Sequence, residues 1–202
     1  MTTAKDLFII AMDPVPEHTV GQGDLSLALA GAELLDLIGA GAVTVEGDLI
    51  VPGGASAPDD RLLGEAAAQI TRQPPHERIE DWLWRRGRDL AATYQDALEK
   101  DGELTERRSG LLPFGPRRVE LVDTPGRRRA IGRREEGEPV LAALASAVGL
   151  DGERSGDDEP GLDDETVTTV VATVNEAVME LEAVRQRRTI ENTAFANVWR
   201  GP

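Results

Sequence analysis

The stretch Trp82–Arg88, WLWRRGR, holds the residues of this chain best suited to contact an anion. On a helix of about 100° per residue, Trp82 falls on the apolar stripe, whereas Arg85 and Arg88 fall on the opposite face. Trp84 falls off the stripe, so we expect it to be partly exposed. An exposed Trp beside outward arginines suits a membrane interface or an anionic headgroup. The alternative is that Trp84 packs on a neighbouring helix and the arginines make surface ion pairs.

A second candidate surface lies in residues 109–129, SGLLPFGPRRVELVDTPGRRR. Its first half carries three apolar side chains held between Gly and Pro: Leu111, Leu112 and Phe114. Its second half carries five arginines, of which Arg117 and Arg118 flank the apolar tip. Such a tip can enter the edge of a bilayer, with its arginines near anionic lipid. It can equally bury against a second copy of the chain or against another protein.

Charge is unevenly distributed along the chain. The formal net charge is −15, yet residues 85–134 contain 13 Lys/Arg and 8 Asp/Glu, a local balance of +5 that leaves −20 on the rest. A nucleic-acid-binding protein is usually basic overall, so DNA and RNA are poor candidates for partners. A local basic patch suits a partner with confined negative charge, such as a phosphorylated lipid headgroup or an acidic protein surface. The alternative is that these arginines pair with nearby carboxylates.

No motif in the chain indicates catalysis, a metal or a cofactor. His18 and His76 are far in sequence from any plausible nucleophile, and no phosphate-binding Gly-Lys-Ser/Thr motif occurs. The acidic stretch 151–164 places Leu162 where a calcium loop needs its bidentate Glu, so a solvated acidic loop is the better interpretation. The sequence therefore predicts a protein that is not an enzyme and carries no cofactor.

Composition bounds the fold and the compartment. The chain has 202 residues, 3% aromatic residues and no Cys, so its core must consist of Ala, Leu, Val and Ile, which favours helices. No apolar run approaches the roughly 20 residues that a membrane span needs, and the N-terminus is unlike a signal peptide. We therefore expect a cytoplasmic protein that can attach peripherally to the inner face of the membrane.

Hydrophobic spacing predicts a mainly α-helical single domain over residues 1–202, with one or two small β-hairpins. Helices are expected over residues 4–12, 24–38, 60–72, 76–100, 127–134, 140–148 and about 164–187. Asp24 and Asp60 are placed to cap the second and third of these helices. Arg86 falls near the apolar stripe of the fourth, from which its charged end can reach water. Hairpins are expected around Glu46-Gly47-Asp48 and over residues 103–123.

The serial order of several segments resembles the Golgi phosphoprotein 3 family, in particular its bacterial, actinobacterial members. The resemblance lies in LFIIAMD, in LSLALAGAELLDLIGAGAVTVEG, in LLGEAAAQI followed by PPHERIEDWL, and in ALEKDGELTERRSGLLPF. It covers residues 6–135 well and the C-terminal helices loosely. The resemblance implies a mostly helical domain that binds phosphatidylinositol 4-phosphate at a membrane surface. It also implies a hydrophobic hairpin that enters the bilayer or mediates self-association.

The family's headgroup residues carry over only in part. The resemblance places Gly21 where the family has a Trp and Ala30 where it has the first Arg. It places Arg88 at the first of two paired arginines and Ala91 at the second, with Arg85 as a substitute donor. We therefore expect two alternative functions. One is binding of an anionic, phosphoinositide-like lipid through Arg88, Arg85 and Trp84, and the other is self-association or partner binding through the 109–123 hairpin.

Overall fold

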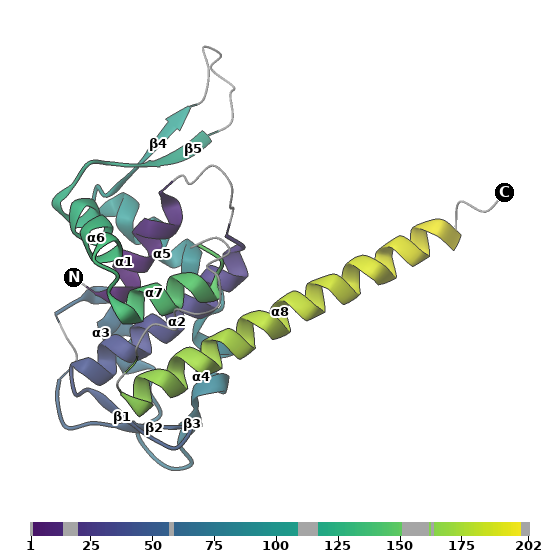
Figure 1. Cartoon of the computed structure of the whole chain (residues 1–202). Coiled ribbons are helices and arrows are strands. Elements are labelled where there is room, and N and C mark those ends of the chain that lie inside the picture. The colour runs from purple at the N-terminus through teal and green to yellow at the C-terminus, as the bar shows by residue number, and fades with distance from the viewer. Residues whose placement is uncertain are drawn as a thin grey trace.

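The part of the chain that the structure describes contains eight helices, and six of the others pack on the central helix α2 (Figure 1). The structure is a computed structural model, and it describes residues 2–13, 20–56, 59–108, 117–150, 162 and 164–198. The helices are α1 (Thr3–Met12), α2 (Gln22–Gly39), α3 (Arg61–Ala68), α4 (Ile79–Arg86), α5 (Leu90–Lys100), α6 (Pro125–Glu135), α7 (Pro139–Ala147) and α8 (Glu165–Val198). The predicted mainly α-helical fold is confirmed.

Two small antiparallel sheets accompany the helices. The first has the order β1 (Val43–Glu46), β2 (Leu49–Pro52) and β3 (Glu77–Arg78), and the second pairs β4 (Leu104–Arg108) with β5 (Arg117–Leu121). In the first hairpin Glu46 stands opposite Leu49, and Gly47 has the positive φ of 66° that a tight hairpin turn requires. Both predicted hairpins are confirmed, whereas strand β3 was not predicted.

The central helix α2 is buried on nearly all sides because its residues are small or aliphatic. Its sequence, QGDLSLALAGAELLDLIG, places twelve residues in the core, and α1, α3, α4, α5, α7 and α8 all contact it. Gly31 permits close approach of α8, because a Cβ at this position would lie only 2.4 Å from Cγ2 of Val174. The small side chains of α2 thus allow several helices to pack closely against it.

One predicted helix is broken in two. Residues 76–100 form α4 and α5, which are separated at Gly87, Arg88 and Asp89, and Asp89 adopts the left-handed region at φ 55°. Gly87 packs on the backbone of α2, where an added Cβ would lie 2.5 Å from the Leu83 carbonyl and 3.2 Å from that of Ser26. The continuous helix expected from periodicity was therefore wrong, because this glycine fits a close contact that the apolar stripe does not reveal.

Other helix ends also differ from the predictions. Asp60 caps α3 by accepting the amides of Leu62 and Leu63, as expected, but α3 ends at Ala68. Helix α2 begins at Gln22 without a side-chain cap, so the capping role expected for Asp24 was wrong. Helix α8 continues to Val198, eleven residues past its predicted end.

Arg86 corrects a further expectation. Its guanidinium does not reach water but donates two hydrogen bonds to the buried carboxylate of Glu33, at 2.7 and 2.9 Å. The Tyr94 hydroxyl donates a third to the same carboxylate at 3.1 Å. Burial raises the pKa of Glu33, and these donors oppose that shift. These hydrogen bonds connect α4 and α5 to α2 inside the core.

Candidate functional site

A pocket of about 410 Å³ lies where the beginning of α2, the α4–α5 junction and α8 meet. Trp84, Arg88 and Asp89 line it from the junction, and Leu181 lines it from α8. Trp84 is half-buried against the core, as its off-stripe position predicts, and Arg88 is exposed. The structure therefore brings together two of the three predicted headgroup residues.

The junction that carries Arg88 is fixed by contacts with α2. Ser26 Oγ accepts the amide of Ala91 at 3.0 Å, which supplies the first turn of α5 with a cap from another helix. Because Gly87 also lies against the Ser26 carbonyl, both sides of Arg88 are anchored on one residue of α2. Arg88 is thus presented from a short, fixed turn between two helices.

Arg88 differs from most other arginines because no described residue forms a hydrogen bond or ion pair with its side chain. The arginines of α6, by contrast, are paired: Arg127 with Asp13, Arg128 with Asp123, and both Arg129 and Arg133 with the buried Asp6. The alternative interpretation of the basic patch, pairing with nearby carboxylates, is therefore correct for α6. An unpaired guanidinium can give a phosphate or carboxylate two charge-assisted hydrogen bonds.

Arg85 does not line this pocket. Its guanidinium donates to both oxygens of Glu77, at 2.6 and 2.7 Å, and lies 5.1 Å from the ring centroid of Trp82. The Glu77 carboxylate keeps the pKa of Arg85 raised, so the group stays charged within a structural ion pair. The surface-pair alternative fits Arg85, and Arg88 is left as the free cation of this pocket within the described chain.

Helix α8 supplies a part of the site that no sequence pattern indicated. Arg185 donates to both carboxylate oxygens of Asp24, at 2.8 and 2.6 Å, across 161 positions of sequence. A Cβ on Gly23 would lie 2.8 Å from Arg185 Nη2 and 2.8 Å from Leu181 Cδ2. Helix α8 therefore packs over the start of α2, and it can approach this closely because residue 23 is a glycine.

Gly21, Ala30 and Ala91, which the resemblance sets at headgroup positions, have clear structural environments. A Cβ on Gly21 would lie 2.2 Å from the Asp24 carboxylate and 3.2 Å from Arg185, so a larger side chain needs that ion pair to move. Ala30 is fully buried, and its carbonyl accepts the Trp82 indole N–H at 3.1 Å. Ala91 is 2% exposed. Helix packing and the Asp24–Arg185 ion pair therefore leave no room for a larger side chain at Gly21 or Ala30 without rearrangement.

The apolar tip predicted for the second hairpin, with Leu111, Leu112 and Phe114, lies outside the described residues. Arg117 and Arg118 belong to β5, opposite Arg108 and Arg107. Helix α5 begins at the pocket and ends just before β4, and its 11 residues span about 16 Å. The pocket and the base of the hairpin therefore stand at the two ends of one short helix.

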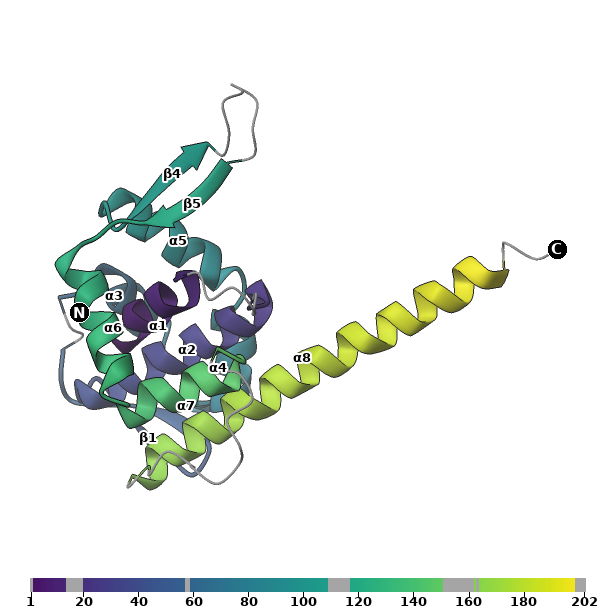
Figure 2. The ribbon, with the colours of Figure 1, turned by 45° about the horizontal axis from the view of Figure 1, so that its top comes forward.

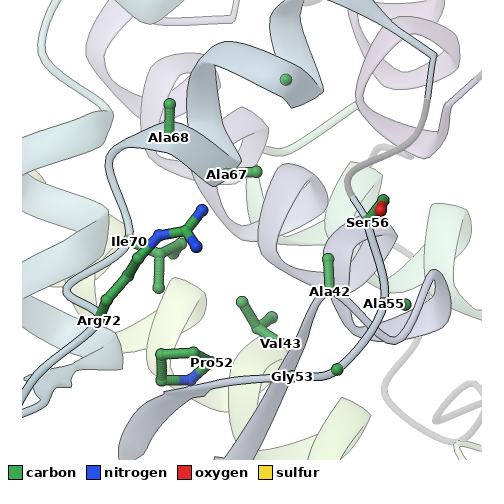
Figure 3. Close-up of a pocket in the computed structure, with 12 residues that line it drawn as sticks. Ala42, Val43, Pro52, Gly53, Ala55, Ser56, Ala67, Ala68, Ile70 and Arg72 are labelled. Atoms are coloured by element: carbon green, nitrogen blue, oxygen red, sulfur yellow. The ribbon is translucent and has the colours of Figure 1, made fainter.

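A second pocket, of about 500 Å³, lies between the β1–β2 hairpin and α3 (Figure 3). Most of its lining is small, with Ala and Gly from both elements, and Arg72 extends into it. No described residue pairs with Arg72, so this arginine is a natural point of comparison for Arg88. No aromatic residue lines this pocket, and none of the predicted site residues is in its lining.

No group of three or more His, Cys, Asp or Glu side chains in the described part of the chain is arranged to hold a metal ion. No helix there is both long and apolar enough to cross a membrane.

The fold and the site define a mainly α-helical protein whose central helix carries a surface pocket with one unpaired arginine and one half-buried tryptophan. The family model for Golgi phosphoprotein 3 (GPP34) matches residues 4–189, and the chain belongs to this family. The match extends beyond residues 6–135 and includes residues 165–189 of α8. A search of curated proteins gave no match.

Proposed function

We propose that this protein binds the phosphate of an anionic lipid headgroup at the cytoplasmic face of a membrane, without catalysing a reaction. The observation that carries the proposal is Arg88. It is an exposed guanidinium without a described partner, and it lies in a pocket beside Trp84. The family resemblance also implies that Arg88 corresponds to a headgroup arginine. Trp84 offers an amphipathic ring of the kind that favours the membrane interface.

The charges around Arg88 limit what the pocket can hold. Asp89 lines the same pocket, and Arg185 is neutralised by Asp24 at its edge. One free cation with a nearby carboxylate suits a single phosphate better than a headgroup bearing several. A lone arginine near an anionic surface contributes about 1 kcal/mol. We therefore propose general anionic-lipid binding with weak headgroup selection, in place of the specific phosphoinositide binding that the family resemblance implies.

The hairpin would supply the apolar share of the attachment. Leu111, Leu112 and Phe114 are three side chains whose transfer from water is favourable by about 25 cal/mol per Å² of apolar surface. The rest of the chain is strongly acidic, so the protein would approach the membrane only through the surface near the pocket and the hairpin. Binding of this kind weakens as salt screens the surface charges.

The test is sedimentation with vesicles of phosphatidylcholine alone, or mixed with phosphatidylglycerol or phosphatidylinositol 4-phosphate. We expect binding to both anionic mixtures at low salt and about fivefold weaker binding for Arg88→Ala, the equivalent of about 1 kcal/mol. Arg72→Ala is the matched control, because it removes an equally exposed and unpaired arginine from the other pocket. Absence of binding by the wild type, or equal loss for the two variants, contradicts the proposal.

A further inference from the structure

The second half of α8 extends away from the body of the protein (Figures 1 and 2). Its first half packs on α2, α4 and α7, but every side chain from Gln186 to Asn192 is exposed. Helices in proteins derive most of their stability from packing of an apolar face against another element. The projecting segment of α8 has no such support within the described chain.

Apolar side chains recur along the face of α8 that points away from the body, with the polar Gln186 between the second and the third of them. Of the three large apolar side chains that are exposed in the described chain, two are on α8: Met179 is 72% exposed and Ile190 69%. They are eleven positions apart, which on a helix places them within about 20° of each other, and the exposed Ala183 lies within about 40° of both. Leu181, which lies against Gly23, is on the opposite face.

Opposite charges border this stripe on one side. Glu180 and Arg187 are exposed, lie seven positions apart and therefore share one flank of the helix. Neither forms an ion pair with a described residue. The flank is thus acidic near the body and basic near the projecting end. When two copies of the helix lie antiparallel, the acidic part of each faces the basic part of the other.

We propose that the Met179–Ala183–Ile190 stripe is an interface between two copies of this chain, whose α8 helices pair antiparallel about a centre beside Ala183. In that register Glu180 of each copy stands level with Arg187 of the other. Met179 of one copy comes within about 3 Å, along the axis, of Ile190 of the second. Ala183 from both copies lies at the centre, where small side chains let helices approach closely.

Charge and shape both favour the antiparallel arrangement. A parallel pair would place the two Glu180–Arg187 flanks on opposite sides of the interface, where these charges could not pair with each other. Each body packs on the first half of its own α8, on the face opposite the stripe. The two bodies therefore lie at opposite ends and on opposite sides of the helix pair, where they do not collide. The interface is independent of the Arg88 pocket and of the 109–123 hairpin.

Sedimentation velocity from micromolar to submillimolar concentration tests the proposal. We expect the wild type to form a reversible dimer, and Met179→Asp and Ile190→Asp each to raise its dissociation constant about tenfold or more. Arg187→Glu should weaken the dimer about fivefold or more, because two attractive pairs become repulsive. Arg188→Glu is its matched control, since it makes the same charge change on the other side of the helix and should have little effect.

A mixing experiment separates this interface from any other. Glu180→Arg and Arg187→Glu chains should each dimerise poorly alone but form a heterodimer when mixed, because two ion pairs then form, one as in the wild type and one with its charges exchanged. The chain has no Cys, so Ala183→Cys can be joined by a short bifunctional maleimide, whereas Arg188→Cys should not be. A wild type that stays monomeric, or a dimer that tolerates the stripe variants and dissociates on Leu112→Asp, overturns the proposal.

Discussion

Arg86 on α4 and Glu33 on α2 form a two-bond ion pair inside the core, with Nε–Oε2 at 2.7 Å and Nη2–Oε1 at 2.9 Å. Glu33 is completely buried, and the Tyr94 hydroxyl completes its hydrogen bonding. This pair immediately precedes the junction that presents Arg88. The geometry of the candidate site therefore depends on a charge pair that lies beneath it.

Removal of Arg86 should be strongly destabilising. Arg86→Ala leaves the Glu33 carboxylate buried without its cation, which costs about 3–5 kcal/mol of unfolding free energy. Arg61→Ala breaks an exposed pair with Glu65 and should cost about 1 kcal/mol or less. Denaturant titration followed by circular dichroism measures both values. A similar loss of unfolding free energy in the two variants would show that the Arg86–Glu33 pair does not stabilise the core more than an exposed pair does.

The free energy of unfolding should depend on pH through the carboxyl group of Asp36. Its carboxylate accepts the amides of Thr3 and Ala4, at 3.0 and 3.1 Å, and burial raises its pKa above the ordinary 3.8 despite these donors. The folded state thus retains the proton more tightly than the unfolded chain does. The stability contributed by Asp36 is full below the unfolded pKa and is lost as pH rises through the raised pKa of the folded state.

Asp36→Asn removes this titration and one accepting oxygen. The lost acceptor adds a cost that does not change with pH, so the informative quantity is the difference in unfolding free energy between variant and wild type. That difference should move in favour of the variant between about pH 4 and about pH 7, by about 1.4 kcal/mol for each unit by which the pKa is raised. Thermal unfolding across this range measures it, and a constant difference argues against the raised pKa.

Asp24 should restrain binding of anions. Its carboxylate occupies the Arg185 guanidinium at the edge of the candidate pocket. Asp24→Asn removes one negative charge and leaves Arg185 available to a phosphate, so we expect about fivefold tighter binding to phosphatidylglycerol vesicles. Asp48→Asn makes the same charge change beside Arg78, outside both the pocket and the 109–123 hairpin, and should have a smaller effect. Weaker binding by Asp24→Asn would place the anion elsewhere.

The hairpin prediction concerns membrane attachment alone. Leu112→Asp replaces an apolar side chain between β4 and β5 with a charged one, which should reduce vesicle binding because the charge resists transfer from water. Its unfolding free energy should stay close to that of the wild type. Unchanged vesicle binding by a folded variant would remove the hairpin from the attachment surface.

Much of the fold could be predicted because local patterns agree with it. Alternating apolar residues around Gly47 specify the first hairpin, and Asp60 marks the start of α3. The break at Gly87 could not be predicted, because the apolar stripe continues on both sides and the cause is contact with α2. The burial of Arg86 was likewise hidden, since periodicity reports the side on which a residue lies and not the presence of a buried carboxylate to receive it.

Only those residues of the candidate site that are close together in sequence could be predicted. Trp84 and Arg88 lie four positions apart, so helical geometry places them on one stretch of surface. Leu181 and Arg185 reach the pocket across more than ninety residues, and no spacing rule connects them to Gly23 or Asp24. Arg85 and Arg88 looked equivalent for a different reason. The partner of Arg85, Glu77, is only eight residues away but belongs to β3, a strand of two residues that was not predicted.

The central claim is that the anion contacts Arg88, and the most direct measurement is amide chemical-shift mapping with a soluble inositol phosphate or glycerol phosphate as the probe. We predict that the perturbed amides cluster at Gln22–Ser26 and Gly87–Asp89, and that Arg88→Ala abolishes the perturbations. Perturbations centred on Gly53–Ser56 and Arg72, or a response that persists in Arg88→Ala, would contradict the account.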